Sequence, residues 1–183
     1  MQKKIQIFER GLFMKYYCIM VLTGEEKKFK ERAQEAFKNT CSEALLYFFE
    51  CDMFTKKRGW YKGALFPSYI FLGVEELTSD FFSTLRSVKG FCRVLRDNQN
   101  PTPITGRALE ELRQLISYGE VLGVSQFEFV EGEPIHVKSG PLANYEWEIL
   151  KVNRKKGEVT IQTSLIESGM RFTLKFTEVE PVK

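Results

Sequence analysis

Apolar and polar positions follow two different periods along the first 118 residues. A run of aromatic and β-branched residues from Tyr16 to Leu22 predicts a buried strand. From Glu25 to Lys38 the apolar side chains recur at helical spacing, which predicts an amphipathic helix. Similar patterns predict strands at 45–54, 65–74 and 91–95, a helix capped by Ser79 or Asp80 and ended by Gly90, and a helix at 107–118.

The pattern changes after Gly119. Residues 119–126 resemble a short linker, and every later element reads as a strand bounded by turn residues, with no room for a crossover helix. We therefore predict an α+β fold: an α/β sandwich of an antiparallel sheet with helices at 14–118, and a small β-barrel at 127–183. Residues 1–13 show no clean period. They are either an ordered extension or they precede the true start of the chain at Met14, and we favour the second interpretation.

Composition narrows the class of protein. The chain has 183 residues, 43% hydrophobic and 28% charged, which fits a globular protein of one large or two small domains and excludes a fully disordered one. Residues 1–126 hold 19 basic and 15 acidic side chains (+4), and residues 127–183 hold 8 and 9 (−1). This modest bias allows a nucleic-acid partner without requiring one. No apolar run is long enough for a membrane span or shaped like a signal peptide, so a cytoplasmic protein without membrane association is expected.

Catalytic and metal-binding patterns are missing from the sequence. The four cysteines have no zinc-site spacing and are interpreted as small buried residues: Cys18, Cys41, Cys51 and Cys92. The single histidine, His136, falls on the solvent face of a predicted strand. Adjacent acids do not face one another on a helix and are interpreted as solvated: Glu25–Glu26, Glu75–Glu76 and Glu110–Glu111. We expect no catalytic residue, no metal, no cofactor and no enzyme activity.

Aromatic and basic side chains gather between residues 55 and 69. Lys56, Lys57 and Arg58 form a predicted exposed hairpin tip beside Trp60 and Tyr61. Aromatics mixed with cations can stack on nucleobases and neutralise phosphates. The alternative is that the aromatics belong to the core and the cations to a solvated tip, and the spacing does not decide between them.

The stretch LFPSYIFL at 65–72 resembles the FFPGY strand in the amino-terminal domain of the NusG family. The likeness continues in family order at 15–29, 79–95 and 100–114, and EGEPIHVKSGPL at 131–142 resembles the opening of a KOW domain. It covers residues 14–183. Ser68 and Trp147 stand where the family usually has glycine, which suggests a specialised paralogue similar to RfaH or to LoaP-type antiterminators.

This resemblance implies a transcription elongation or antitermination factor that binds RNA polymerase and suppresses pausing or termination. Carried over by position, the polymerase-binding residues are Tyr16, Phe66 and Tyr69, with a second contact at Thr78, Ser79 and Asp80. Simple strand alternation points Phe66 and Tyr69 to opposite faces unless the chain bends at Pro67. The basic loop at 56–58 would lie near upstream or non-template DNA.

In the family the KOW domain recruits a ribosomal protein, a termination factor or RNA such as a leader hairpin. The candidate nucleic-acid contacts here are His136, Lys138, Trp147, Arg154, Lys155 and Lys156. The strict alternation at 171–179 predicts a barrel instead of the helical hairpin of RfaH, and a monomer is expected. One alternative is a ribosome-associated RNA-binding KOW protein, but the net positive charge is low for that class. A second alternative is an enzyme with a cysteine nucleophile, but the sequence places no histidine within reach of a cysteine.

Overall fold

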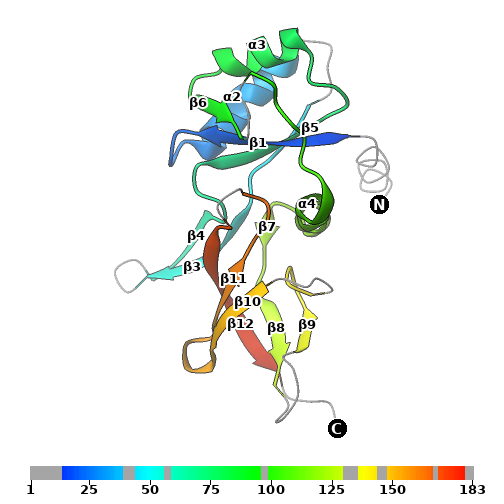
Figure 1. Ribbon diagram of the computed structural model, residues 1–183. Coiled ribbons are helices and arrows are strands. Elements are labelled where there is room, and N and C mark those ends of the chain that lie inside the picture. Colours follow the sequence, from blue (N-terminus) through cyan, green and yellow to red (C-terminus); the bar gives the residue numbers. More distant parts are fainter. Residues whose placement is uncertain are drawn as a thin grey trace, which may run out of the picture. The chain divides into compact units, whose positions relative to one another are not determined.

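The computed structural model describes residues 14–38, 44–55, 59–95, 99–129, 136–143, 148–166 and 169–179 (Figure 1). Its contacts divide the chain into two compact units. The first takes Met1–Phe48 and Phe66–Leu109, and the second takes Phe49–Leu65 and Glu110–Lys183. The division falls inside helix α4, which runs from Gly106 to Tyr118. Each unit is described by itself.

The first unit is a four-stranded antiparallel sheet in the order β2-β5-β1-β6. Helices α2 and α3 lie side by side on one side of β1 and β5 (Figure 1). The unit also contains the first turn of α4. Its strands and other helices are β1 (Lys15–Val21), α2 (Glu26–Lys38), β2 (Leu45–Tyr47), β5 (Tyr69–Val74), α3 (Ser79–Ser87) and β6 (Phe91–Val94).

The core of this unit lies between the sheet and the two helices. Alternate β1 residues point into it, and α2 adds one apolar stripe, so the predicted strand and helix are both confirmed. Phe37 of α2 stacks on Phe81 of α3 with ring centroids 4.1 Å apart. The β1 and α2 members of the core are Tyr17, Ile19, Val21, Phe29, Ala33 and Phe37.

Three sequence predictions for the first 95 residues need correction. The predicted strand at 45–54 is two strands in different sheets, β2 and β3. The predicted strand at 65–74 begins only at Tyr69, because a turn precedes it. Helix α3 is capped by Thr78, whose hydroxyl accepts the Phe81 N–H at 3.2 Å, and not by Ser79 or Asp80.

The second unit contains two sheets and one short helical turn. Five strands form one sheet in the order β10-β11-β12-β8-β9, and three form a smaller sheet in the order β4-β3-β7. Its elements, besides the rest of α4, are β3 (Glu50–Thr55), β4 (Gly59–Ala64), β7 (Val121–Leu122), β8 (Ser125–Glu128), β9 (His136–Ser139), β10 (Glu148–Asn153), the 3₁₀ turn η1 (Arg154–Lys156), β11 (Glu158–Gln162) and β12 (Arg171–Val179).

These elements confirm the predicted α+β class and the strand-rich carboxyl-terminal part. Phe127 of β8 stacks on Phe176 of β12 at 4.6 Å, inside the five-stranded sheet's own core. The predicted linker at 119–126 contains β7 and the start of β8. The domain bounds 14–118 and 127–183 stay a prediction. No helix among the described residues is long and apolar enough to cross a membrane.

A buried carboxylate attaches α4 to the connection between β11 and β12. Glu111 is only 1% exposed, and its oxygens accept hydrogen bonds from the Thr163 hydroxyl at 2.7 Å, the Ser164 hydroxyl at 2.7 Å and the Ser164 N–H at 3.0 Å. A buried carboxylate is tolerated only where such donors replace its water shell. The expectation that Glu110–Glu111 is solvated is therefore wrong for Glu111.

We expect Glu111→Ala to lower the free energy of unfolding by about 2 kcal/mol, because it leaves buried donors without an acceptor. Glu110→Ala is the matched control, since Glu110 is exposed on the same helix and should change stability by no more than about 0.5 kcal/mol. Urea unfolding of both variants measures the difference. Equal stability of the two variants would contradict this account of Glu111.

Candidate functional site

A tight turn precedes β5. The Tyr69 N–H donates to the Phe66 carbonyl at 3.1 Å, and Ser68 has a φ of 73°. Proline at the second position and a positive φ at the third are the features of a type II β-turn. That geometry favours glycine at the third position, so serine there carries left-handed strain. The turn also explains why residues 65–68 are not strand.

The carboxylate of Glu26 holds this turn. Glu26 is 5% exposed, and its Oε1 accepts the Ser68 N–H at 2.7 Å and the Gly24 N–H at 3.0 Å. The hydroxyls of Ser68 and Thr23 share a hydrogen bond of 2.7 Å, and the Ser68 carbonyl accepts the Val21 N–H at 2.8 Å. Every polar group of Ser68 is thus engaged, which compensates for the strain at its backbone.

The turn brings Phe66 onto the same face of the sheet as Tyr69. The Phe66 ring packs edge to face on Phe71 at 5.4 Å, and Phe71 shares its face with Tyr69 two residues away. Tyr16 lies on this face as well, because it pairs with Gly73 in β5. This is the face opposite α2 and α3. The opposite-face arrangement that simple alternation gave for Phe66 and Tyr69 is replaced by the bend at Pro67.

The three aromatic residues differ in exposure. Tyr16 and Phe66 are 2% and 1% exposed, whereas Tyr69 is partly exposed. The Tyr16 ring covers Gly73, where a Cβ would stand 2.9 Å from the ring, and packs 6.4 Å from the Tyr47 ring. Tyr69 therefore presents the accessible ring, and Tyr16 and Phe66 pack in the same layer.

The second predicted contact lies at the start of α3. Thr78, Ser79 and Asp80 are all exposed. Thr78 uses its hydroxyl as the helix cap, and the Asp80 carbonyl accepts the Thr84 hydroxyl at 3.0 Å. The side chains of Ser79 and Asp80 thus project from a rigid helix end.

The basic candidates at 56–58 lie outside the described residues. The hairpin that carries them is described: β3 and β4 pair antiparallel, and the last pair of the register is Thr55 with Gly59. The exposed loop or hairpin tip predicted for Lys56, Lys57 and Arg58 stays a prediction.

Two of the six candidates in the carboxyl-terminal part make ion pairs. Arg154 makes an ion pair with Glu178 and lies 4.5 Å over the Phe129 ring, and Lys138 makes an ion pair with Glu128 at 2.7 Å. Glu178 raises the pKa of Arg154. Three more of the candidates are exposed, namely His136, Lys155 and Lys156. Trp147 lies outside the described residues.

The described residues offer no catalytic arrangement. Among them, no group of three or more His, Cys, Asp or Glu side chains could hold a metal ion. Cys18 and Cys51 are buried, and burial raises the pKa of the Cys51 thiol to about 11. Cys92 is exposed, so the expectation of burial is wrong for it.

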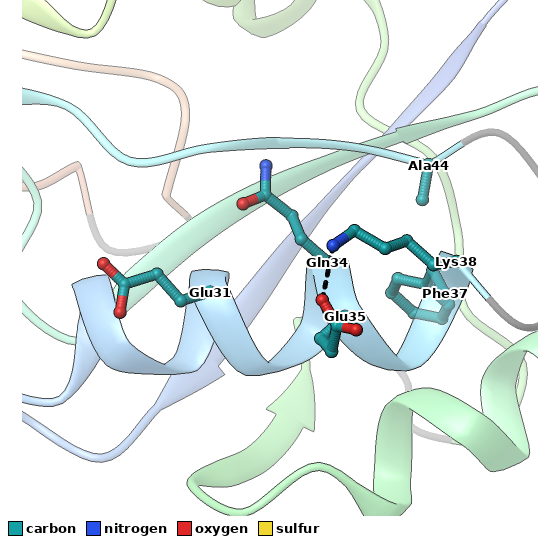
Figure 2. A pocket seen from close by; sticks show the side chains of 6 residues that line it. All are labelled: Glu31, Gln34, Glu35, Phe37, Lys38 and Ala44. Atoms are coloured by element: carbon teal, nitrogen blue, oxygen red, sulfur yellow. Dashed lines mark hydrogen bonds and ion pairs between the residues drawn. The ribbon is translucent and has the colours of Figure 1, made fainter.

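One hollow of about 580 Å³ opens beside α2 (Figure 2). Figure 2 shows the ion pair between Lys38 and Glu35 at its centre. Exposed i,i+3 ion pairs of this kind contribute little and organise no chemistry. The lining residues are Glu31, Gln34, Glu35, Phe37, Lys38 and Ala44.

Comparison with known proteins decides the family. A family model described as the transcription termination factor NusG matches residues 14–113, more than half of the chain. The chain belongs to the NusG family. It is therefore a transcription termination/antitermination factor, and members of this family are not enzymes.

NusG proteins of two bacteria are similar over nearly the whole chain. NusG of Thermus thermophilus is 23% identical over 182 residues, covering 91% of this chain and 97% of that protein. NusG of Campylobacter jejuni is 20% identical over 174 residues, covering 92% and 97%. A solved structure of Thermotoga maritima NusG, reporting domain interaction, has a TM-score of 0.58 at 18% identity and covers 94% of this chain and 99% of that one, so the fold is the same.

Sequence analysis missed Glu26, which shapes the candidate surface of this NusG-family chain. The pair Glu25–Glu26 was expected to be solvated, and that is wrong for Glu26. Glu25 is partly exposed to solvent. Its carboxylate accepts hydrogen bonds from Lys28 and Arg32, and these bonds lower the pKa of Glu25. A signal existed: Glu26 continues the buried stripe of α2, three residues before Phe29.

We expect Ser68→Gly to be more stable than Ser68→Ala by about 1 kcal/mol, because both lose the hydroxyl but only alanine keeps the cost of a positive φ. The difference between the free energies of unfolding of the two variants, measured in urea, gives the cost of the positive φ at residue 68. If the alanine variant is as stable as the glycine variant, the turn does not hold residue 68 in the left-handed region.

Proposed function

We propose that this NusG-family chain binds RNA polymerase through the sheet face that carries Tyr16, Phe66 and Tyr69. The supporting observation is that the turn at 66–69 and the pairing of β1 with β5 bring these three aromatic side chains to one face opposite the helices. Tyr69 is the accessible contact, and Tyr16 and Phe66 support it from within the layer. Tyrosine is enriched among the residues that contribute most to the affinity of protein interfaces.

The exposed start of α3 provides a second contact with the polymerase, through Thr78, Ser79 and Asp80. Two contacts on one rigid unit can bridge two parts of the enzyme and favour the conformation in which both are reached. The protein then suppresses pausing or termination by binding one polymerase conformation better than another, with no bond made or broken. The β3–β4 hairpin carries Lys56, Lys57 and Arg58 towards upstream or non-template DNA.

We assign the carboxyl-terminal strands the role of a KOW domain that recruits a further partner. The net charge of −1 over 127–183, the Arg154–Glu178 pair and the Lys138–Glu128 pair favour a protein partner, such as a ribosomal protein or termination factor, over RNA. His136, Trp147, Lys155 and Lys156 remain the candidates for contact with a leader RNA hairpin. The same low charge speaks against a ribosome-associated RNA-binding protein.

We further infer a specialised paralogue of the RfaH or LoaP type that acts in the cytoplasm. The serine at the strained position of the turn supports this, because its hydroxyl makes a hydrogen bond with Thr23 that the usual glycine cannot make. Trp147 in place of the usual KOW glycine supports it as well.

We expect Tyr69→Ala to weaken binding of the full chain to core RNA polymerase about thirtyfold, since an interface aromatic contributes about 2 kcal/mol when truncated. Tyr118→Ala is the matched control, because Tyr118 is 42% exposed on the second unit, and it should bind within about twofold of wild type. Fluorescence anisotropy measures both affinities. A folded Tyr69→Ala variant with wild-type affinity would contradict the proposal.

A further inference from the structure

One row of side chains on the face opposite the helices is open to solvent. Met20 of β1 pairs directly with Tyr69 of β5 on one side and with Arg93 of β6 on the other. Directly paired residues of antiparallel strands point to the same face, so the three form a continuous row. Tyr69 and Met20 are partly exposed and Arg93 is exposed. Leu22, 52% exposed just after β1, adds apolar surface beyond the strand end.

The charge in this row is uncompensated. Arg93 makes no hydrogen bond or ion pair with any described residue. Among the other described cations of this unit, Lys28 and Arg32 pair with Glu25 and Lys38 pairs with Glu35, whereas Lys27 and Lys89 make no ion pair with a described residue either. An arginine beside a half-exposed tyrosine and methionine has the composition of the centre of a protein interface, where Arg, Tyr and Met are enriched.

We propose that Arg93 is a specificity-determining contact for the polymerase. One polymerase surface packs on Tyr69 and Met20, and Arg93 pairs with a carboxylate on that surface. The partner is thus an apolar protein surface with an acidic side chain at one edge. This inference rests on the proposed function and names a chemical requirement of the same face. Arginine suits the role because its planar fork bonds a carboxylate in two places while its stem packs on apolar atoms.

A nucleic acid fits this row less well. Binding to phosphates without a protein partner needs several cations along one groove. Three described cations of the same unit belong to the helix side of the sheet: Arg86 lies 4.5 Å over the Phe82 ring of α3, and the Lys89 carbonyl accepts a hydrogen bond from Arg32 of α2. Among the described strand residues of this face, Arg93 is therefore the one cation.

The test measures the affinity of the full chain for core RNA polymerase, first without nucleic acid and then with a DNA–RNA scaffold. It compares Arg93→Glu with the control Lys89→Glu. Both replace an exposed cation by an acid, but Lys89 lies on the helix side. We expect Arg93→Glu to weaken binding at least about tenfold at low salt, with a smaller ratio at high salt, and Lys89→Glu to change it by less than about twofold. Thermal unfolding of each variant checks that it folds.

Four results would overturn the inference. If Arg93→Glu binds polymerase with wild-type affinity while Tyr69→Ala binds more weakly, Arg93 has no acidic partner on the polymerase. The proposed function is not affected by that result. If Lys89→Glu weakens binding as much as Arg93→Glu does, the loss comes from the change in net charge and not from a specific ion pair of Arg93. A loss seen only when a DNA–RNA scaffold is present assigns Arg93 to nucleic acid. Failure of the wild-type chain to bind polymerase overturns the proposed function and this inference together.

Discussion

The buried carboxylate of Glu26 is the interaction on which the exposed end of the first sheet depends. Its Oε1 accepts two backbone N–H groups, one from the β1–α2 connection and one from the turn before β5. Hydrogen bonds to a charged group contribute about 1.5–3 kcal/mol each, which offsets the roughly 1–2 kcal/mol of left-handed strain at Ser68. Glu26 also lies in the first turn of α2, where the helix dipole favours a negative charge.

The arrangement of the face follows from this constraint. Once the turn is fixed, β5 begins at Tyr69 and pairs with β1 in one register. That register sets Tyr16 over Gly73, Phe71 beside Cys18, and Tyr69 beside Met20. One end of the face is consequently closed by packed rings and the other stays open. A one-residue slip of β5 would turn Tyr69 into the core and remove the surface altogether.

Much of this fold can be predicted from sequence, because the long elements have clear periods. Helix α2 and strand β1 follow from their apolar spacing, and the strand-rich part follows from short runs between glycine turns. The turn at 66–69 is harder to predict because its apolar residues continue the strand pattern, and only proline followed by a residue with positive φ marks it. Burial of Glu26 and Glu111 is non-local, since their donors lie 42 and 52 residues away.

The face opposite α2 and α3 can be tested directly by photo-crosslinking. A photoreactive phenylalanine analogue at position 69 should crosslink the chain to core RNA polymerase on illumination. The same analogue at position 34, exposed on α2 on the other side of the sheet, should give no such product. A crosslink at 34 without one at 69, or none at 69, would contradict the account that Tyr69 faces the polymerase.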